Sequence, residues 1–136
     1  MKLDGVLKET EDLFVNVLDG TSIPKSIRFE LIASNDMKDV GKVAKANEIL
    51  KYMTEVDIIV LINETIFDRL GDDQKKMIIE ELLAQVYWDS NSGKIKLIKP
   101  DVNTFSLLIK KYGIDFYLGV KDSIASVLNE LDSIEG

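Results

Sequence analysis

The stretch that decides the fold covers residues 72–101 and reads DDQKKMIIEELLAQVYWDSNSGKIKLIKPD. Two acids open it, and either Asp72 or Asp73 suits the N-cap position of a helix. The apolar residues that follow face several sides of a helix as far as Trp88, which predicts a long and widely buried helix. A polar turn and a short strand come next, and we expect Pro100 to end that strand and Asp101 to cap another helix.

Two adjacent acids, Glu80 and Glu81, lie in the middle of this apolar helix. One interpretation is a site for a hard cation such as Mg²⁺ or Mn²⁺, completed by a nearby aspartate. The other is structural: neighbouring helical residues diverge by about 100°, so one acid is expected in solvent and the other is expected to pair with a lysine or, if buried, with strand hydroxyls, backbone amides or a lysine. We favour the second. The candidate aspartates are Asp57, Asp89 and Asp101; the candidate lysines are Lys76, Lys94 and Lys96 for an exposed acid, and Lys42 and Lys45 for a buried one.

The composition excludes several kinds of chemistry. The 136 residues include no cysteine and no histidine, which removes thiol nucleophiles, Ser–His pairs and the usual zinc ligands. A net charge of −7 disfavours direct binding to nucleic acid or to an anionic membrane. No apolar run approaches the roughly 18 residues of a spanning helix. We therefore expect a cytoplasmic protein without a cofactor, built as a single domain over residues 1–136.

The other elements are predicted from apolar periodicity and turn residues. An amphipathic helix is expected from about Leu3 to Gly20, and a central strand over the continuous apolar run at 58–62. In a short helix at 48–53, Ile49, Leu50 and Met53 are expected to face inward. The further strands are expected at 27–32 and 40–46, and the further helices at 63–70, 101–113 and 115–131. This order predicts an α+β fold, in which a small mixed or antiparallel sheet packs against the long central helix between N- and C-terminal helices.

The middle of the chain, residues 57–113, resembles the phage metallopeptidase family, a compact relative of the SprT-like zincins. The likeness lies in the order and spacing of elements that are ordinary when taken alone. They are the strand and helix start at 57–64, the helix cap at 72–74, the strand at 92–97 and the closing helix that ends at 111–113. The resemblance implies a zincin-like scaffold and a phage origin, which would place the protein in the host cytoplasm.

Active members of that family carry the motif HExxH on the long helix, where two histidines bind zinc and the glutamate activates water. By this resemblance Glu80 and Ala84 stand at the two ligand positions, and Glu81 stands at the position of the general base. A further histidine of the family falls near Lys99 or Pro100. Because the chain has no histidine, the resemblance implies a degenerate member, with Glu80 and Glu81 as vestigial catalytic candidates.

Aromatic residues are the candidate binding residues of the chain. Trp88 could anchor a partner, and Tyr112, Phe116 and Tyr117 cluster at the turn between two predicted helices. The alternative for each of them is packing in the core or at its boundary.

These observations favour a non-catalytic phage protein that acts by binding another protein, as an accessory or inhibitory factor. The enzymatic alternative is a hydrolase that uses Mg²⁺ or Mn²⁺ held by Glu80, Glu81 and Asp89. A third possibility is a structural or virion-associated phage component. The sequence does not identify the partner protein, and we expect neither direct nucleic acid binding nor membrane association.

Overall fold

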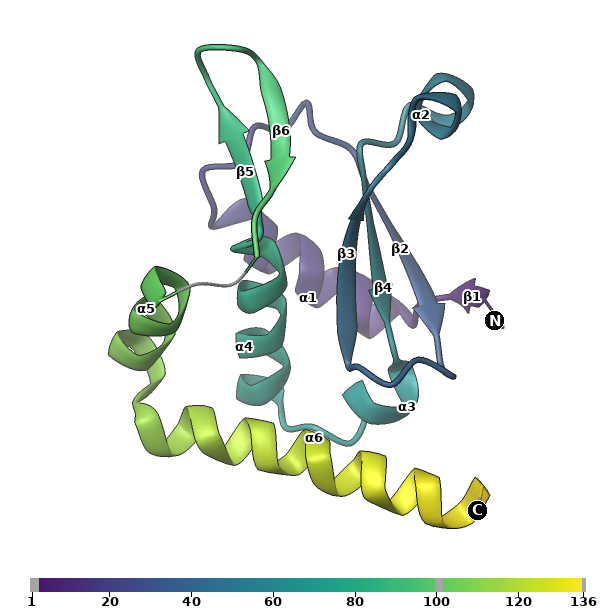
Figure 1. Cartoon of the computed structure of the whole chain (residues 1–136), viewed down its shortest axis with the longest axis vertical. Coiled ribbons are helices and arrows are strands. Elements are labelled where there is room, and N and C mark those ends of the chain that lie inside the picture. The colour runs from purple at the N-terminus through teal and green to yellow at the C-terminus, as the bar shows by residue number, and fades with distance from the viewer. Residues whose placement is uncertain (1–2, 100–101, 136) are drawn as a thin grey trace.

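The computed structural model describes residues 3–99 and 102–135, so the predictions made for Pro100 and Asp101 lie outside the described residues (Figure 1). The strands are β1 (Leu3–Gly5), β2 (Phe29–Ser34), β3 (Gly41–Lys45), β4 (Ile58–Ile62), β5 (Val86–Asp89) and β6 (Lys94–Leu97). The helices are α1 (Lys8–Asp19), α2 (Glu48–Thr54), α3 (Glu64–Phe67), α4 (Asp72–Leu83), α5 (Val102–Tyr112) and α6 (Ile114–Glu135).

A small mixed sheet has the strand order β1-β2-β4-β3. Strand β4 lies inside it, parallel to β2 and antiparallel to β3, while β1 is antiparallel to β2. The side chains of Ile58, Val60 and Ile62 are fully buried on one face of β4, and β-branched residues suit such a pleated, covered surface. The predicted central strand, the mixed sheet and the terminal helices are confirmed.

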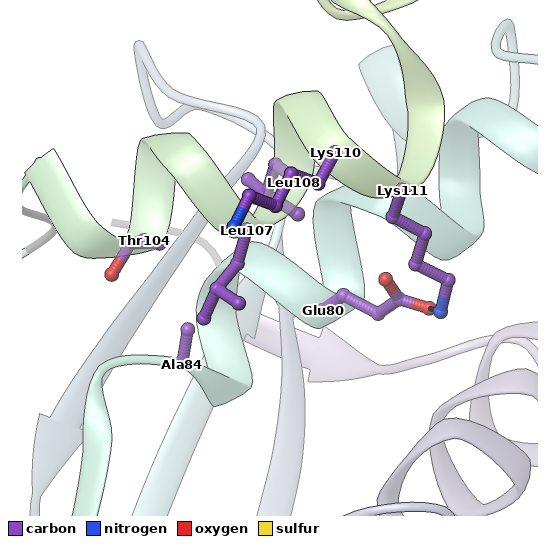
Figure 2. Close-up of a pocket in the computed structure, with 7 residues that line it drawn as sticks. All are labelled: Glu80, Ala84, Thr104, Leu107, Leu108, Lys110 and Lys111. Atoms are coloured by element: carbon purple, nitrogen blue, oxygen red, sulfur yellow. Dashed lines mark hydrogen bonds and ion pairs between the residues drawn. The ribbon is translucent and has the colours of Figure 1, made fainter.

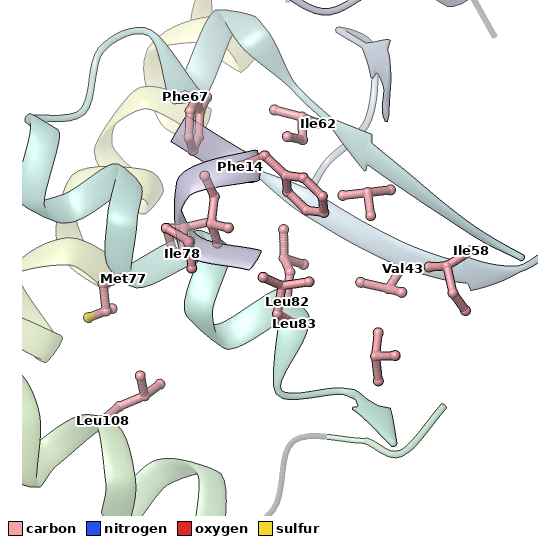
Figure 3. Close-up of a cluster of buried hydrophobic side chains, with 14 of the residues drawn as sticks. Phe14, Val43, Ile58, Ile62, Phe67, Met77, Ile78, Leu82, Leu83 and Leu108 are labelled. Carbon is pink, nitrogen blue, oxygen red and sulfur yellow. The ribbon is translucent and has the colours of Figure 1, made fainter. Parts of the chain in front are cut away.

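The hydrophobic core lies between this sheet and the helices α1 and α4 (Figure 3). Phe14 of α1 is buried and meets the ring of Phe29 edge-on, with ring centroids 5.5 Å apart. Leu82 of α4 approaches the sheet at Gly41, where a side chain on the glycine would lie 2.7 Å from the leucine Cδ1. The glycine therefore permits the close packing of β3 against α4.

The central helix α4 differs from the prediction at both ends. Its N-cap is Gly71, not one of the two aspartates, and the backbone N–H of Gly71 donates to Gln74 Oε1 at 2.8 Å. The helix ends at Leu83 instead of reaching Trp88, because the residues from Val86 onward form strand β5 and pair antiparallel with β6. Aromatic and β-branched side chains favour this hairpin, and its turn contains Gly93 at φ +65°.

Two further predictions on the N-terminal half were wrong. Residues 3–5 form strand β1 instead of the first turn of a helix, because they pair with the edge of β2. Helix α2 exists as predicted, but it has no buried residue, and 73% of Ile49 and 74% of Met53 is exposed. No element of the described chain covers this side of α2, which projects beyond the end of the sheet (Figure 1).

Helices α5 and α6 form the C-terminal part of the molecule and meet at Gly113, whose φ of +88° suits a helix C-terminus. Helix α6 runs past the end of α4 and along α3 (Figure 1). Its residues Val120 and Val127 are buried. Arg69 and Glu130 form an ion pair at 2.7 Å across this contact. Within the described ranges, none of the helices has the combined length and hydrophobicity that crossing a bilayer demands.

Candidate functional site

The two central acids of α4 are each held by a lysine from a C-terminal helix. Lys111, at the end of α5, donates from Nζ to Glu80 Oε1 at 2.7 Å (Figure 2). Lys121 of α6 donates to both carboxylate oxygens of Glu81, at 2.8 and 2.9 Å. Only 17% of the Glu80 side chain and 19% of the Glu81 side chain is exposed. Because both carboxylates are mostly shielded from water, each depends on its lysine for compensation of its charge.

The two acids reach different helices because successive residues of an α-helix turn by about 100°. One acid was expected in solvent and the other beside a lysine; both in fact pair with lysines, and the predicted partners were wrong. The real partners lie 31 and 40 residues later in the chain, on helices that tertiary packing brings to α4. A signal for Lys121 was present in the sequence: it lies at helical spacing between Tyr117 and Ile124, on the side of α6 that packs inward.

A cavity of about 430 Å³ lies beside Glu80, between α4 and α5 (Figure 2). Ala84 lines it one turn beyond Glu80 on the same side of α4. Leu107 and Leu108 of α5 give it an apolar wall, and 67% of Leu107 is exposed. We call this cavity the α4–α5 groove; its lining residues are Glu80, Ala84, Thr104, Leu107, Leu108, Lys110 and Lys111.

The aromatic candidates at the turn between α5 and α6 surround the two lysines. Tyr112 stacks on Phe116 with ring centroids 5.2 Å apart, and Tyr117 meets Phe105 edge-on at the same distance. The ammonium of Lys121 lies 5.3 Å from the centroid of the Tyr117 ring. Tyr112, Phe116 and Tyr117 are half-buried against the core. Their role in binding a partner therefore stays a prediction.

The hydroxyl of Tyr112 is a buried polar group near the Glu80–Lys111 ion pair. It has no hydrogen-bond partner within the described residues. Burial raises the pKa of the Tyr112 phenol well above its ordinary value, and the neighbouring Glu80 carboxylate raises it further. The tyrosine is therefore neutral throughout the physiological range, and its ring contributes packing.

Asp89, the third candidate metal ligand, is the last residue of β5 and lies away from the two glutamates of α4. Its carboxylate accepts hydrogen bonds from Ser92 Oγ at 2.9 Å and from the backbone N–H of Asn91 at 3.0 Å. The Ser92 hydroxyl and then the Asn91 N–H hold the pKa of Asp89 below its ordinary value. Over residues 3–99 and 102–135, no three acidic side chains gather in a way that could hold a metal ion.

A buried acid that sequence analysis did not single out is Glu64, the first residue of α3, with 9% of the residue exposed. Its carboxylate accepts from Thr10 Oγ1 at 3.1 Å and from the backbone N–H of Leu7 at 3.4 Å. Leu7 is the N-cap residue of α1 and offers no side-chain acceptor. Glu64 therefore supplies the missing acceptor at the positive end of α1. The sequence signal for this role was that Leu7, the residue before α1, has no side-chain oxygen that could cap the helix.

Comparison with known protein families gives a match over most of the chain. The family model described as "Putative phage metallopeptidase" matches residues 9–130. The matched range includes both ion pairs of α4 and the α4–α5 groove. The comparisons with curated proteins and with solved structures gave no match.

Proposed function

Because the chain belongs to the phage metallopeptidase family, we propose that it is a non-catalytic member that acts by binding another protein. Its role would be that of an accessory or inhibitory factor for that partner. The observation that carries the proposal is the pairing of Glu80 with Lys111 and of Glu81 with Lys121. Glu81, which the family resemblance places at the position of the general base, thus holds α6 against α4, and Glu80 holds α5.

The donor set on α4 does not fit the zinc ion of active relatives. Ala84, at the second ligand position, has no donor atom, and the chain offers no imidazole or thiolate elsewhere. Glu80 and Glu81 already face ammonium groups at 2.7 and 2.8 Å. A cation at either carboxylate would have to displace the lysine ammonium group and remain close to it. Coulomb repulsion between these two positive charges disfavours that arrangement.

The α4–α5 groove supports the binding part of the proposal. Leu107 is a large apolar residue on the surface of α5, and Leu108 and Ala84 continue its apolar surface inward. Lys110 lies at the rim and has no ion pair among the described residues. An apolar floor with a charged rim is the usual anatomy of a protein-binding surface.

Thermal unfolding with added divalent ions tests the non-catalytic part. We expect Mg²⁺, Mn²⁺ and Zn²⁺ to leave the Tm of the wild-type protein unchanged, because the acids are already paired. Glu81→Gln should lower the Tm by the same amount with or without metal. A metal-dependent rise in Tm that disappears in Glu81→Gln would instead support the hydrolase that uses Glu80, Glu81 and Asp89.

Affinity purification from the native host, followed by mass spectrometry, tests the binding part. Leu107→Glu places a charge in the groove, and Val15→Glu places the same charge on the exposed side of α1, where 47% of Val15 is exposed. We expect a partner that the wild-type protein and Val15→Glu retain and Leu107→Glu loses. Recovery of the same proteins by both variants would contradict binding through the groove.

A further inference from the structure

A second cavity, of about 520 Å³, lies between the β5–β6 hairpin and α2. Both elements project from the same end of the molecule, opposite α6 (Figure 1). The hairpin contributes Trp88 and Lys94, and the end of β3 contributes Lys45. The walls are completed by α2 and by the segments that precede β2 and β4. We call this the hairpin cavity, and it does not include Glu80 or Glu81.

The hairpin cavity carries an excess of positive charge. Arg28 and Lys51 are balanced by ion pairs with acids of the same wall, at 2.8 Å to Glu55 and 3.0 Å to Asp57. Two other lysines that line the cavity, Lys45 and Lys94, have no ion pair within the described residues. The lining thus holds four basic and two acidic side chains, although the whole chain has a net charge of −7. Asp89 lies opposite Lys94 in the β5–β6 ladder but does not line the cavity.

Apolar surface accompanies these charges. Trp88 is half-buried beside Ile95, its partner on β6, and both residues line the cavity. Helix α2 supplies Lys51 to the wall, and its C-cap residue Glu55 lines the wall as well. Outside the cavity lining, α2 also exposes 89% of Tyr52 together with Ile49 and Met53. Neighbouring apolar side chains that remain exposed on a folded protein usually mark an interaction surface.

We propose that the hairpin cavity binds a short acidic segment of a partner protein. Carboxylates of the segment would pair with Lys45 and Lys94, and an apolar side chain beside them would pack on Trp88. This inference builds on the proposed function and gives the chemistry of the partner. A long nucleic acid fits less well than a short segment, because every phosphate beyond those that pair with the two lysines would meet Glu55, Asp57 and the net negative charge of the chain.

The chain provides its own reporter for this site, because Trp88 is its only tryptophan. The test is a fluorescence titration with a hexaglutamate peptide that contains one leucine. The matched probes are the same peptide with glutamine in place of glutamate, and a twenty-nucleotide oligodeoxythymidine. We expect a saturable change in Trp88 emission with the glutamate peptide alone, weakened by added salt.

Charge-matched variants make the titration specific. Lys45→Ala combined with Lys94→Ala should weaken peptide binding at least tenfold. Lys8→Ala combined with Lys76→Ala removes the same charge from exposed positions outside the cavity and should leave binding unchanged. Circular dichroism of each variant checks that the fold is retained.

Three results would overturn the inference: no saturable response to the glutamate peptide, equal weakening in both double variants, or tighter binding of the oligonucleotide. Its failure can be separated from failure of the proposed function. A host partner that Leu107→Glu loses, but that the Lys45→Ala and Lys94→Ala variant retains, would leave the proposed function standing without this site.

Discussion

Lys121 joins α6 to α4 through two hydrogen bonds from its Nζ to the carboxylate of Glu81, at 2.8 and 2.9 Å. The preceding residue, Glu80, binds Lys111 of α5. Neighbouring positions of one helix therefore fix two different helices of the C-terminal part. We infer that the structural role of the two acids is to hold α5 and α6 against α4.

Removing one charge of the Glu81–Lys121 pair should destabilise the fold. We expect Glu81→Gln to lower the free energy of unfolding by about 1–2 kcal/mol, between the values typical of exposed and of buried pairs. Lys121→Gln should have a similar effect, and the double variant should lose less than the sum of the two. Urea denaturation measures all three. Glu11→Gln on the exposed side of α1 is the control, and an equal loss there would contradict a specific pair.

Tyr112→Phe should stabilise the protein. The substitution removes a buried hydroxyl that has no hydrogen-bond partner in the described chain and keeps the ring that stacks on Phe116. An unsatisfied buried polar group costs about 1–3 kcal/mol, so we expect a gain of roughly 1 kcal/mol.

A second readout of Tyr112→Phe is the stability of the protein at alkaline pH. Burial raises the pKa of Tyr112 in the folded state, so the folded state holds this proton more tightly and the free energy of unfolding falls as pH rises above the unfolded pKa of about 10. That alkaline loss should be smaller in Tyr112→Phe, and a lower Tm at pH 7 would show that the hydroxyl is satisfied.

Gly41→Ala should destabilise the contact between β3 and α4. The new Cβ would lie 2.7 Å from Leu82 Cδ1, so the leucine would have to move within a packed core. Overpacking typically costs 1–3 kcal/mol, and we expect about 1 kcal/mol because the end of a side chain gives way more easily than backbone. Combining Gly41→Ala with Leu82→Ala should reduce the added cost of the alanine. Gly5→Ala, which meets nothing within 4 Å, should be close to neutral in the same denaturation assay.

Asp57→Asn should reduce the loss of folding stability that occurs as the pH falls into the acidic range. Partial burial alone would raise the pKa of Asp57, but the Arg28 N–H and Lys51 outweigh it and hold the pKa below its ordinary value. A lowered folded pKa gives stability that is present above the unfolded pKa of about 3.9 and is lost as pH falls through the folded pKa. The variant should therefore be less stable than wild type by about 1 kcal/mol at pH 7 and equally stable near pH 2. Asp12→Asn, at an exposed position, should show no such convergence.

The sequence predicted those parts of the fold whose signals are local. The apolar run of β4 is short and rich in β-branched residues, which favoured a covered strand over a helix. The helix predicted at 63–70 begins at Asn63, a residue type suited to the N-cap, and the Asn63 side-chain oxygen accepts from the backbone N–H of Ile66 at 3.3 Å. The resemblance to the phage metallopeptidase family is confirmed by the family match over residues 9–130, while the assignment of Glu80 and Glu81 as vestigial catalytic residues stays a prediction.

The errors arose where tertiary contacts decide between local options. Val86 to Trp88 suit a helix end or a strand equally well, and pairing with β6 decides in favour of the strand. Ile49 and Met53 have the spacing of a buried helix face, but in the described residues no element covers α2. The lysine partners of the two glutamates depended on how α5 and α6 fold back, which no local pattern encodes.

The ion pair between Glu80 and Lys111 also limits what the surface of α4 can be engineered to hold. Histidines introduced at positions 80 and 84 would lie on one side of the helix, but they would place a divalent ion next to the ammonium group that now lies 2.7 Å from the Glu80 carboxylate. A designed metal site on α4 would therefore need a third substitution at position 111, on a different helix.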